Sequence, residues 1–209
     1  MKKTLPPLDL ASLERALRGR RNLVAQGSVP VAKTAAVYVL FSRHEGAAAV
    51  TLIRRSDTVS QHRGEYAFPG GGVEPHDRNF HDTALREVHE ELGVPADAIE
   101  PWGELSPEMT VTSGFLVVPF TGRLDESAPL SPAPDEVSEV VRVPVASLID
   151  PLSERTISRL AAQPYTGDGL AANGGLMIKT HRAYAYDGRV IWGATARILA
   201  QVISAVQPA

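Results

Sequence analysis

The chain has 209 residues, of which 44% are hydrophobic and 22% are charged, a composition typical of one globular domain. A formal net charge of −3 disfavours nucleic-acid binding through a broad basic surface, and the absence of cysteine excludes disulfides, thiolate nucleophiles and zinc–thiolate sites. No apolar run approaches the roughly 20 residues of a membrane helix, and no signal-peptide core follows the basic start, so a cytoplasmic protein without membrane partners is expected.

Hydrophobic periodicity and turn residues predict the elements of the first half in chain order. A short helix is expected over residues 8–21, with Asp9 as its N-cap. The Glu45-Gly46 pair predicts the turn of a hairpin, and a loop is expected over 56–63. A helix is expected over 80–92, stopped by Gly93. The strands predicted in this half are 33–41, 48–54 and 66–68.

The second half alternates short strands with loops and closes with a helix. Pro119 favours an edge position or a bulge for its strand. Residues 154–162 could be helical, and Asp187-Gly188 predicts a hairpin turn. A mixed α+β domain follows, with helices packed on a sheet. The remaining predictions are strands 102–105, 115–123, 137–143, 183–186 and 189–192, a helical turn at 145–152 and a helix at 194–206.

A cluster of charge lies on the predicted helix 80–92. At 3.6 residues per turn, Glu87 and Glu91 lie about 40° apart and Glu90 about 60° to the other side, so the three carboxylates can face one point. Hard oxygen ligands favour Mg²⁺ or Mn²⁺ over zinc. Arg86 cannot bind a metal and more plausibly orients a neighbouring carboxylate. A solvated acidic helix face remains the alternative.

Three glycines precede this helix. Gly70, Gly71 and Gly72 are expected to form a turn whose backbone N–H groups approach an anion closely, helped by the positive end of the helix. Pro69 fixes the approach to that turn. A glycine turn that admits a pyrophosphate beside a magnesium-binding helix would be a coherent device for phosphate chemistry.

The sequence REVHEELGV, spaced from a preceding glycine, resembles the signature of the Nudix hydrolase family. The resemblance implies an α/β/α sandwich with a mixed β-sheet, and hydrolysis of a nucleoside diphosphate linked to another group. It implies that Glu87 and Glu91 bind the metal, that Glu90 is a further ligand or the base, and that Arg86 belongs to the catalytic set. The implied organisation is a helical extension over 1–30 and a Nudix hydrolase domain over 31–209.

One position departs from that signature. The family has a glutamate eight residues before the arginine, where this chain has Arg78, and Asp77 stands one residue earlier. A loop longer by one residue is similar to the coenzyme A diphosphatase branch of the family. The segment 52–71, LIRRSDTVSQHRGEYAFPGG, is also similar to that branch, although Ser60 replaces its arginine. Segments 113–122, 136–144 and 191–199 are similar to the same branch.

The resemblance implies a Mg²⁺-dependent coenzyme A diphosphatase. Within the family, ADP-ribose, NADH or a nucleoside triphosphate are the alternative substrates, and a silent nucleotide-binding module is a different class of protein. Arg54 and Arg55, beside the glycines, are candidates for binding substrate phosphate, and Glu136 or Glu139 could act as the base. The expected partner is a small-molecule nucleotide, and a homodimer is one possible assembly.

Overall fold

The computed structural model describes residues 8–21, 33–57, 63–110, 114–150, 153–162 and 176–207. Its helices are α1 Leu10–Leu17, α2 Phe80–Leu92, α3 Val145–Ile149 and α4 Gly193–Val206, with a 3₁₀ turn η2 at Ala96–Ala98. Its strands are β1 Thr34–His44, β2 Ala47–Arg55, β3 Tyr66–Ala67, β4 Gly70–Gly72, β5 Ile99–Glu104, β6 Glu108–Met109, β7 Leu116–Leu124, β8 Val137–Pro144, β9 Glu154–Ala162, β10 Leu176–Tyr186 and β11 Arg189–Trp192.

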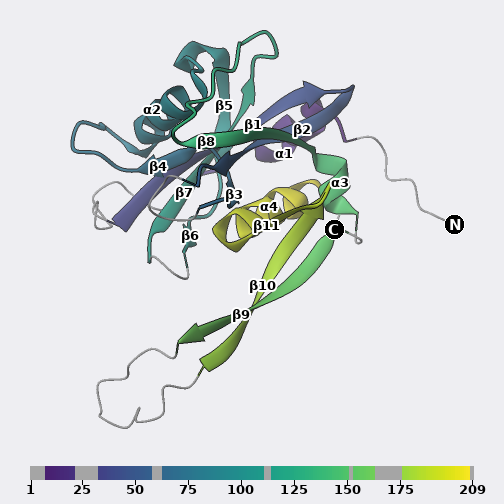
Figure 1. Cartoon of the computed structure of the whole chain (residues 1–209). Coiled ribbons are helices and arrows are strands. Elements are labelled where there is room, and N and C mark those ends of the chain that lie inside the picture. The colour runs from purple at the N-terminus through teal and green to yellow at the C-terminus, as the bar shows by residue number, and fades with distance from the viewer. Residues whose placement is uncertain are drawn as a thin grey trace, which may run out of the picture.

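Strand β1 is buried on both faces. Ala36, Tyr38 and Leu40 belong to one hydrophobic cluster with α2. Val39 and Phe41, which point the opposite way, belong to a second cluster with α1 and α4. The sheet therefore lies between α2 on one side and α4 on the other (Figure 1), and the expected α/β/α sandwich with a mixed sheet is confirmed.

Strand β1 is also the hub of the larger sheet. It pairs antiparallel with β2 across the predicted Glu45-Gly46 turn and parallel with β7, and the strand order through it is β3-β2-β1-β7-β5. Near its start, Ala35, Ala36 and Val37 pair antiparallel with β4, and β8 pairs with β2. These pairings bring residues 70–72 onto the centre of the sheet.

A second, three-stranded sheet has the order β11-β10-β9. The β9–β10 hairpin projects away from the larger sheet (Figure 1). The helical alternative for 154–162 is therefore wrong, because this segment pairs with β10 along its whole length. The predicted Asp187-Gly188 turn is confirmed, with both residues at positive φ.

Two further expectations need correction. Gly70–Gly72 form a strand and not a turn, because their backbone pairs with β1. Pro119 lies in the internal strand β7 and not at an edge. Pro119 faces the interruption between β5 and β6, where its carbonyl accepts a hydrogen bond from the Leu105 N–H, so the one bond that its missing N–H cannot make falls where the ladder is already interrupted.

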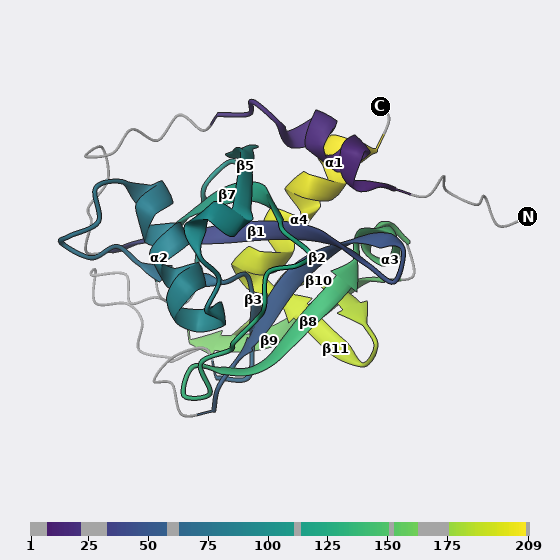
Figure 2. The ribbon, with the colours of Figure 1, turned by 90° about the horizontal axis from the view of Figure 1, so that it is seen from above.

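Helix α1 is part of the core. Its Leu13 and Leu17 are fully buried in the cluster that contains Phe41 and Trp102, whose rings stack 5.5 Å apart. Figure 2 shows α1 beside the end of α4. The expected boundary at residue 30 lies outside the described residues. Among the described helices, none combines the length and apolarity needed to cross a membrane.

Candidate functional site

Helix α2 begins and ends where its capping residues require. The Asn79 side chain accepts a hydrogen bond from the Asp82 N–H at 2.8 Å, and Gly93 ends the helix in the left-handed region at φ +69°. Val88 and Leu92 are fully buried against the sheet. This anchoring fixes the side of the helix that carries Glu87 and Glu91 relative to β4.

The two glutamates lie against neighbouring glycines of β4. The Gly70 N–H donates to Glu91 Oε2 at 2.8 Å. A Cβ atom on Gly71 would lie 2.5 Å from Glu87 Oε1, so only glycine leaves room for that carboxylate. The glycines therefore meet the second half of α2, and not its positively polarised N-terminus as expected from the sequence.

Arg86 links the helix to β4 and to the loop between them. Its Nε and Nη2 donate to the two oxygens of Asp77 at 3.0 and 3.1 Å, and Nη2 also donates to the Gly72 carbonyl at 2.9 Å. Its Nη1 donates to Glu87 and to Glu90, each at 2.9 Å. These contacts support the orienting role expected for Arg86, because a planar guanidinium holds several acceptors in place at once.

Glu87 and Glu91 are acids that burial keeps from ionising easily. Burial raises the pKa of Glu91 to about 8, and the negative charges of Glu87 and Glu136 add to this against the opposing Gly70 hydrogen bond and the Arg55 charge. Burial also raises the pKa of Glu87. A divalent cation beside both carboxylates would remove this cost, so the oxygen donors fit Mg²⁺ or Mn²⁺.

Glu90 differs from the other two carboxylates. Its side chain is 50% exposed and lies on Arg86, whereas the side chains of Glu87 and Glu91 are 13% and 2% exposed. Among the described residues, no three acidic or histidine side chains are arranged as a ready metal site. The buried pair Glu87 and Glu91 is thus the core of the candidate site.

The two arginines of β2 reach different places. Arg55 Nη1 lies 3.6 Å from Glu91 Oε1, and its buried Nε has no hydrogen-bond partner in the described structure. Arg54 instead donates to the Ser138 hydroxyl and faces Asp57. Arg55 therefore borders the carboxylates, whereas Arg54 lies beside β8. Ser60 lies outside the described residues.

The two candidate bases also differ. Glu139 accepts hydrogen bonds from Arg189 at 2.6 Å and from the Tyr66 hydroxyl at 2.9 Å, and the Arg189 hydrogen bond lowers its pKa. Glu136 is exposed, and its charge acts on both Glu87 and Glu91. Of the two, Glu136 is the one whose charge reaches the buried pair.

Asp77 is a residue that sequence reasoning noted but gave no role. Its side chain is 3% exposed and accepts hydrogen bonds from Arg86, from the Glu74 N–H and from the Thr83 hydroxyl. Arg78, at the position where a glutamate was expected, points instead to Asp82 and is 85% exposed. The sequence signal for this role was that Asp77, an acidic residue, directly precedes the position at which the family has a glutamate.

Comparison with known proteins assigns a family to this arrangement. The NUDIX domain family profile matches residues 32–162. A protein of Photorhabdus laumondii described as uncharacterized Nudix hydrolase NudL is 34% identical over 160 residues, covering 75% of this chain and 76% of that protein. A protein of Yersinia pestis with the same description is 32% identical over 158 residues, covering 73% of this chain and 71% of that protein.

A solved structure supports the fold. The crystal structure of a MutT/nudix family protein from Enterococcus faecalis superposes with a TM-score of 0.52 at 19% identity, over 86% of this chain and 62% of that protein. At this identity the likeness concerns the fold alone.

The Asp77 contacts give a pH-dependent contribution to stability. Burial alone would raise the pKa of Asp77, but hydrogen bonds from Arg86, the Glu74 N–H and Thr83 outweigh it and lower the pKa to about 2. Because the folded pKa lies below the ordinary value of 3.8, the contribution is present above about pH 4 and is lost as the pH falls toward 2.

We therefore expect Asp77→Asn to lower the free energy of unfolding by about 2 kcal/mol at pH 7, because charge-assisted hydrogen bonds are lost. The difference from the parent protein should shrink as the pH falls below 4. Urea unfolding between pH 3 and pH 7 measures both. Asp97→Asn, at an exposed position, is the control. A difference that stays constant down to pH 3 would contradict the assignment.

Proposed function

Because the chain belongs to the Nudix hydrolase family, we propose that it hydrolyses the diphosphate bond of coenzyme A or its derivatives, with Mg²⁺ or Mn²⁺ as cofactor. Water would be added across the phosphoric anhydride, giving 4′-phosphopantetheine, or its acyl form, and adenosine 3′,5′-bisphosphate. The buried pair Glu87 and Glu91 against β4 is the observation that carries the hydrolytic part of this proposal.

The choice of coenzyme A is supported by the segment 52–71. Arg55, within the part of it that is similar to the coenzyme A branch, ends β2 at 3.6 Å from Glu91. Phe68, in the same segment, is 2% exposed and leads through Pro69 into β4. The residues that resemble this branch therefore border the two carboxylates, where a diphosphate would bind.

Glu87 and Glu91 would hold the metal ion, which supplies charge neutralisation of the diphosphate and activation of the attacking water. Arg86 keeps Glu87 in place through its hydrogen bond and keeps β4 against the helix through the Gly72 carbonyl. Arg55, whose side chain is 27% exposed beside Glu91, would bind a phosphate oxygen through its guanidinium. Gly71 leaves room for the Glu87 carboxylate and the Gly70 N–H holds the Glu91 carboxylate, so these two glycines would position the metal ligands.

Glu136 is the base that we propose. Glu139 is less suited, because Arg189 and Tyr66 occupy its carboxylate and its pKa is lowered. Glu136 is exposed, so it can exchange a proton with solvent after each turnover. Its carbonyl accepts a hydrogen bond from the Ser56 N–H, which ties it to the residue after Arg55.

A substrate panel tests the proposal. The protein is incubated with Mg²⁺ and coenzyme A, acyl-coenzyme A, ADP-ribose, NADH or deoxynucleoside triphosphates, and the products are identified by mass. We expect kcat/KM to be highest for coenzyme A or its acyl form. Faster cleavage of ADP-ribose or NADH would assign another substrate within the family, and binding without turnover would contradict the enzymatic proposal.

Glu91→Gln tests the metal site. We expect Mg²⁺-dependent turnover to fall by at least about 100-fold, because an amide is a poor ligand for a hard cation. The melting temperature in EDTA should not fall, since glutamine avoids the cost of burying a charge. Glu90→Gln, at a half-exposed position, should lose much less turnover. Equal losses in both variants would argue against the buried pair as the centre of the site.

Two neighbouring glycines provide a matched pair of variants. In Gly71→Ala the new Cβ would lie 2.5 Å from Glu87 Oε1, whereas a Cβ on Gly72 meets nothing within 4 Å. We expect Gly71→Ala to displace the Glu87 carboxylate, lower turnover by at least about tenfold and raise the Mg²⁺ concentration for half-maximal activity. Gly72→Ala should behave like the parent. Parent-like kinetics in both variants would contradict a role for Glu87.

A further inference from the structure

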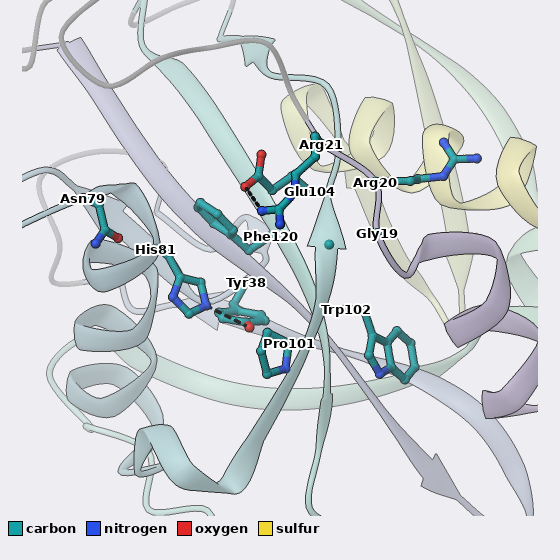
Figure 3. Close-up of a pocket in the computed structure, with 11 residues that line it drawn as sticks. Gly19, Arg20, Arg21, Tyr38, Asn79, His81, Pro101, Trp102, Glu104 and Phe120 are labelled. Atoms are coloured by element: carbon teal, nitrogen blue, oxygen red, sulfur yellow. Dashed lines mark hydrogen bonds and ion pairs between the residues drawn. The ribbon is translucent and has the colours of Figure 1, made fainter.

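A cavity with a volume of about 420 Å³ lies beside the N-terminal part of α2 (Figure 3). It is formed between α2, the strands β1, β7 and β5, and the residues that follow α1. This volume is within the range of small-molecule sites, which is about 300–1,000 Å³. The lining residues are Gly19, Arg20, Arg21, Tyr38, Asn79, His81, Pro101, Trp102, Gly103, Glu104 and Phe120.

This cavity is separate from the glutamate pair. His81 and Glu87 are six residues apart on one helix, which places their side chains about 120° apart around the axis. Glu87 faces β4, whereas His81 contacts Tyr38 and Phe120 toward β7. A ligand in this cavity would therefore lie on a different side of α2 from Glu87 and Glu91.

Aromatic rings form the floor of the cavity. The His81 ring lies 5.1 Å from Phe120, edge to face, and 5.7 Å from Tyr38. His81 Nε2 and the Tyr38 hydroxyl are 3.2 Å apart, which fixes the imidazole in place. Burial lowers the pKa of His81, which favours the neutral form of its ring. The three ring planes are inclined by 42° to 67° to one another, so a planar, uncharged ring can stack on one of them and meet the edge of another.

The rim carries one charge of each sign. Arg21 Nη1 lies 3.6 Å from Glu104 Oε1 above the aromatic rings. The Arg20 guanidinium points away from the cavity, and its Nε donates to the Ala16 carbonyl. The Trp102 indole also points away, because it stacks on Phe41 on the other side of the sheet. The rim therefore offers an acceptor and a donor without a net charge.

The wall is held in place by backbone contacts. The Gly19 N–H donates to the Trp102 carbonyl at 2.8 Å, and the Glu104 N–H donates to the Arg20 carbonyl at 2.9 Å. A Cβ on Gly103 would lie 2.5 Å from the Leu17 carbonyl oxygen, so this close approach requires glycine. The segment after α1 is thus held against β5 by backbone hydrogen bonds, and it forms one wall of the cavity.

We propose that this cavity is a second, non-catalytic binding site for an uncharged amino-bearing purine, as a base or a nucleoside. The purine would stack on the half-buried His81 ring with Phe120 beside it, and its exocyclic amino group would donate to Glu104. A phosphate group would meet Glu104 as well as Arg21, so a nucleotide binds less well than the nucleoside. This proposal does not depend on the substrate hydrolysed at α2.

Calorimetric titration of the full chain in EDTA tests it, with adenosine, AMP and inorganic phosphate as the probes. We expect adenosine to bind more tightly than AMP, and phosphate alone not to bind. His81→Leu replaces the ring by an apolar side chain. It should weaken the affinity for adenosine by about tenfold, as expected for a lost ring contact. Glu104→Gln leaves Arg21 unbalanced and should shift the preference toward AMP.

Two variants separate this site from the other parts of the molecule. Glu100→Gln, on the same strand but outside the cavity, should leave adenosine binding unchanged. Glu91→Gln should also leave it unchanged, whatever it does to hydrolysis. The proposal is overturned if adenosine does not bind at millimolar concentration. It is equally overturned if binding is lost in Glu91→Gln and is unaffected by His81→Leu and Glu104→Gln.

Discussion

The close contact between β4 and α2 is the constraint on which the rest of the site depends. Two carboxylates are buried against β4: Glu87 needs a neighbour that takes up no space, and Glu91 needs a backbone donor. Gly71 meets the first need and the Gly70 N–H the second, while Arg86 holds the Gly72 carbonyl to the helix. Burying these two acids costs free energy in the protein alone, and a divalent cation bound between them would offset that cost.

The sequence reveals α2 and most strands, because apolar spacing and turn residues are local signals. It does not reveal β4, since three glycines have no side-chain pattern, and only pairing with β1 decides their conformation. Spacing alone also does not reveal the acidic partner of Arg86. The position at which the family has a glutamate holds Arg78, and only the path of the folded loop brings the neighbouring Asp77 to Arg86. The cavity at His81 has no local signal, since its residues come from five separate segments.

The smaller sheet links the candidate site to residues beyond the matched family domain. Arg189 of β11 lies outside residues 32–162, yet it binds Glu139 of β8 and, through that carboxylate, the hydroxyl of Tyr66 on β3. These two strands lead to Glu136 and to β4. The carboxy-terminal strands thus brace the two segments that border the buried carboxylates.

The parallel pairing of β1 with β7 has a consequence for the order of folding. Thr34 pairs with Leu116, so the centre of the sheet stays open until residue 116 has been made, whereas the β1–β2 hairpin can form at once. Helix α4, which shares the apolar cluster of Phe41 and Trp102, is made after the strands of the larger sheet. Until it packs there, an unfinished chain has only α1 to cover this apolar face and can associate through it with other unfinished chains.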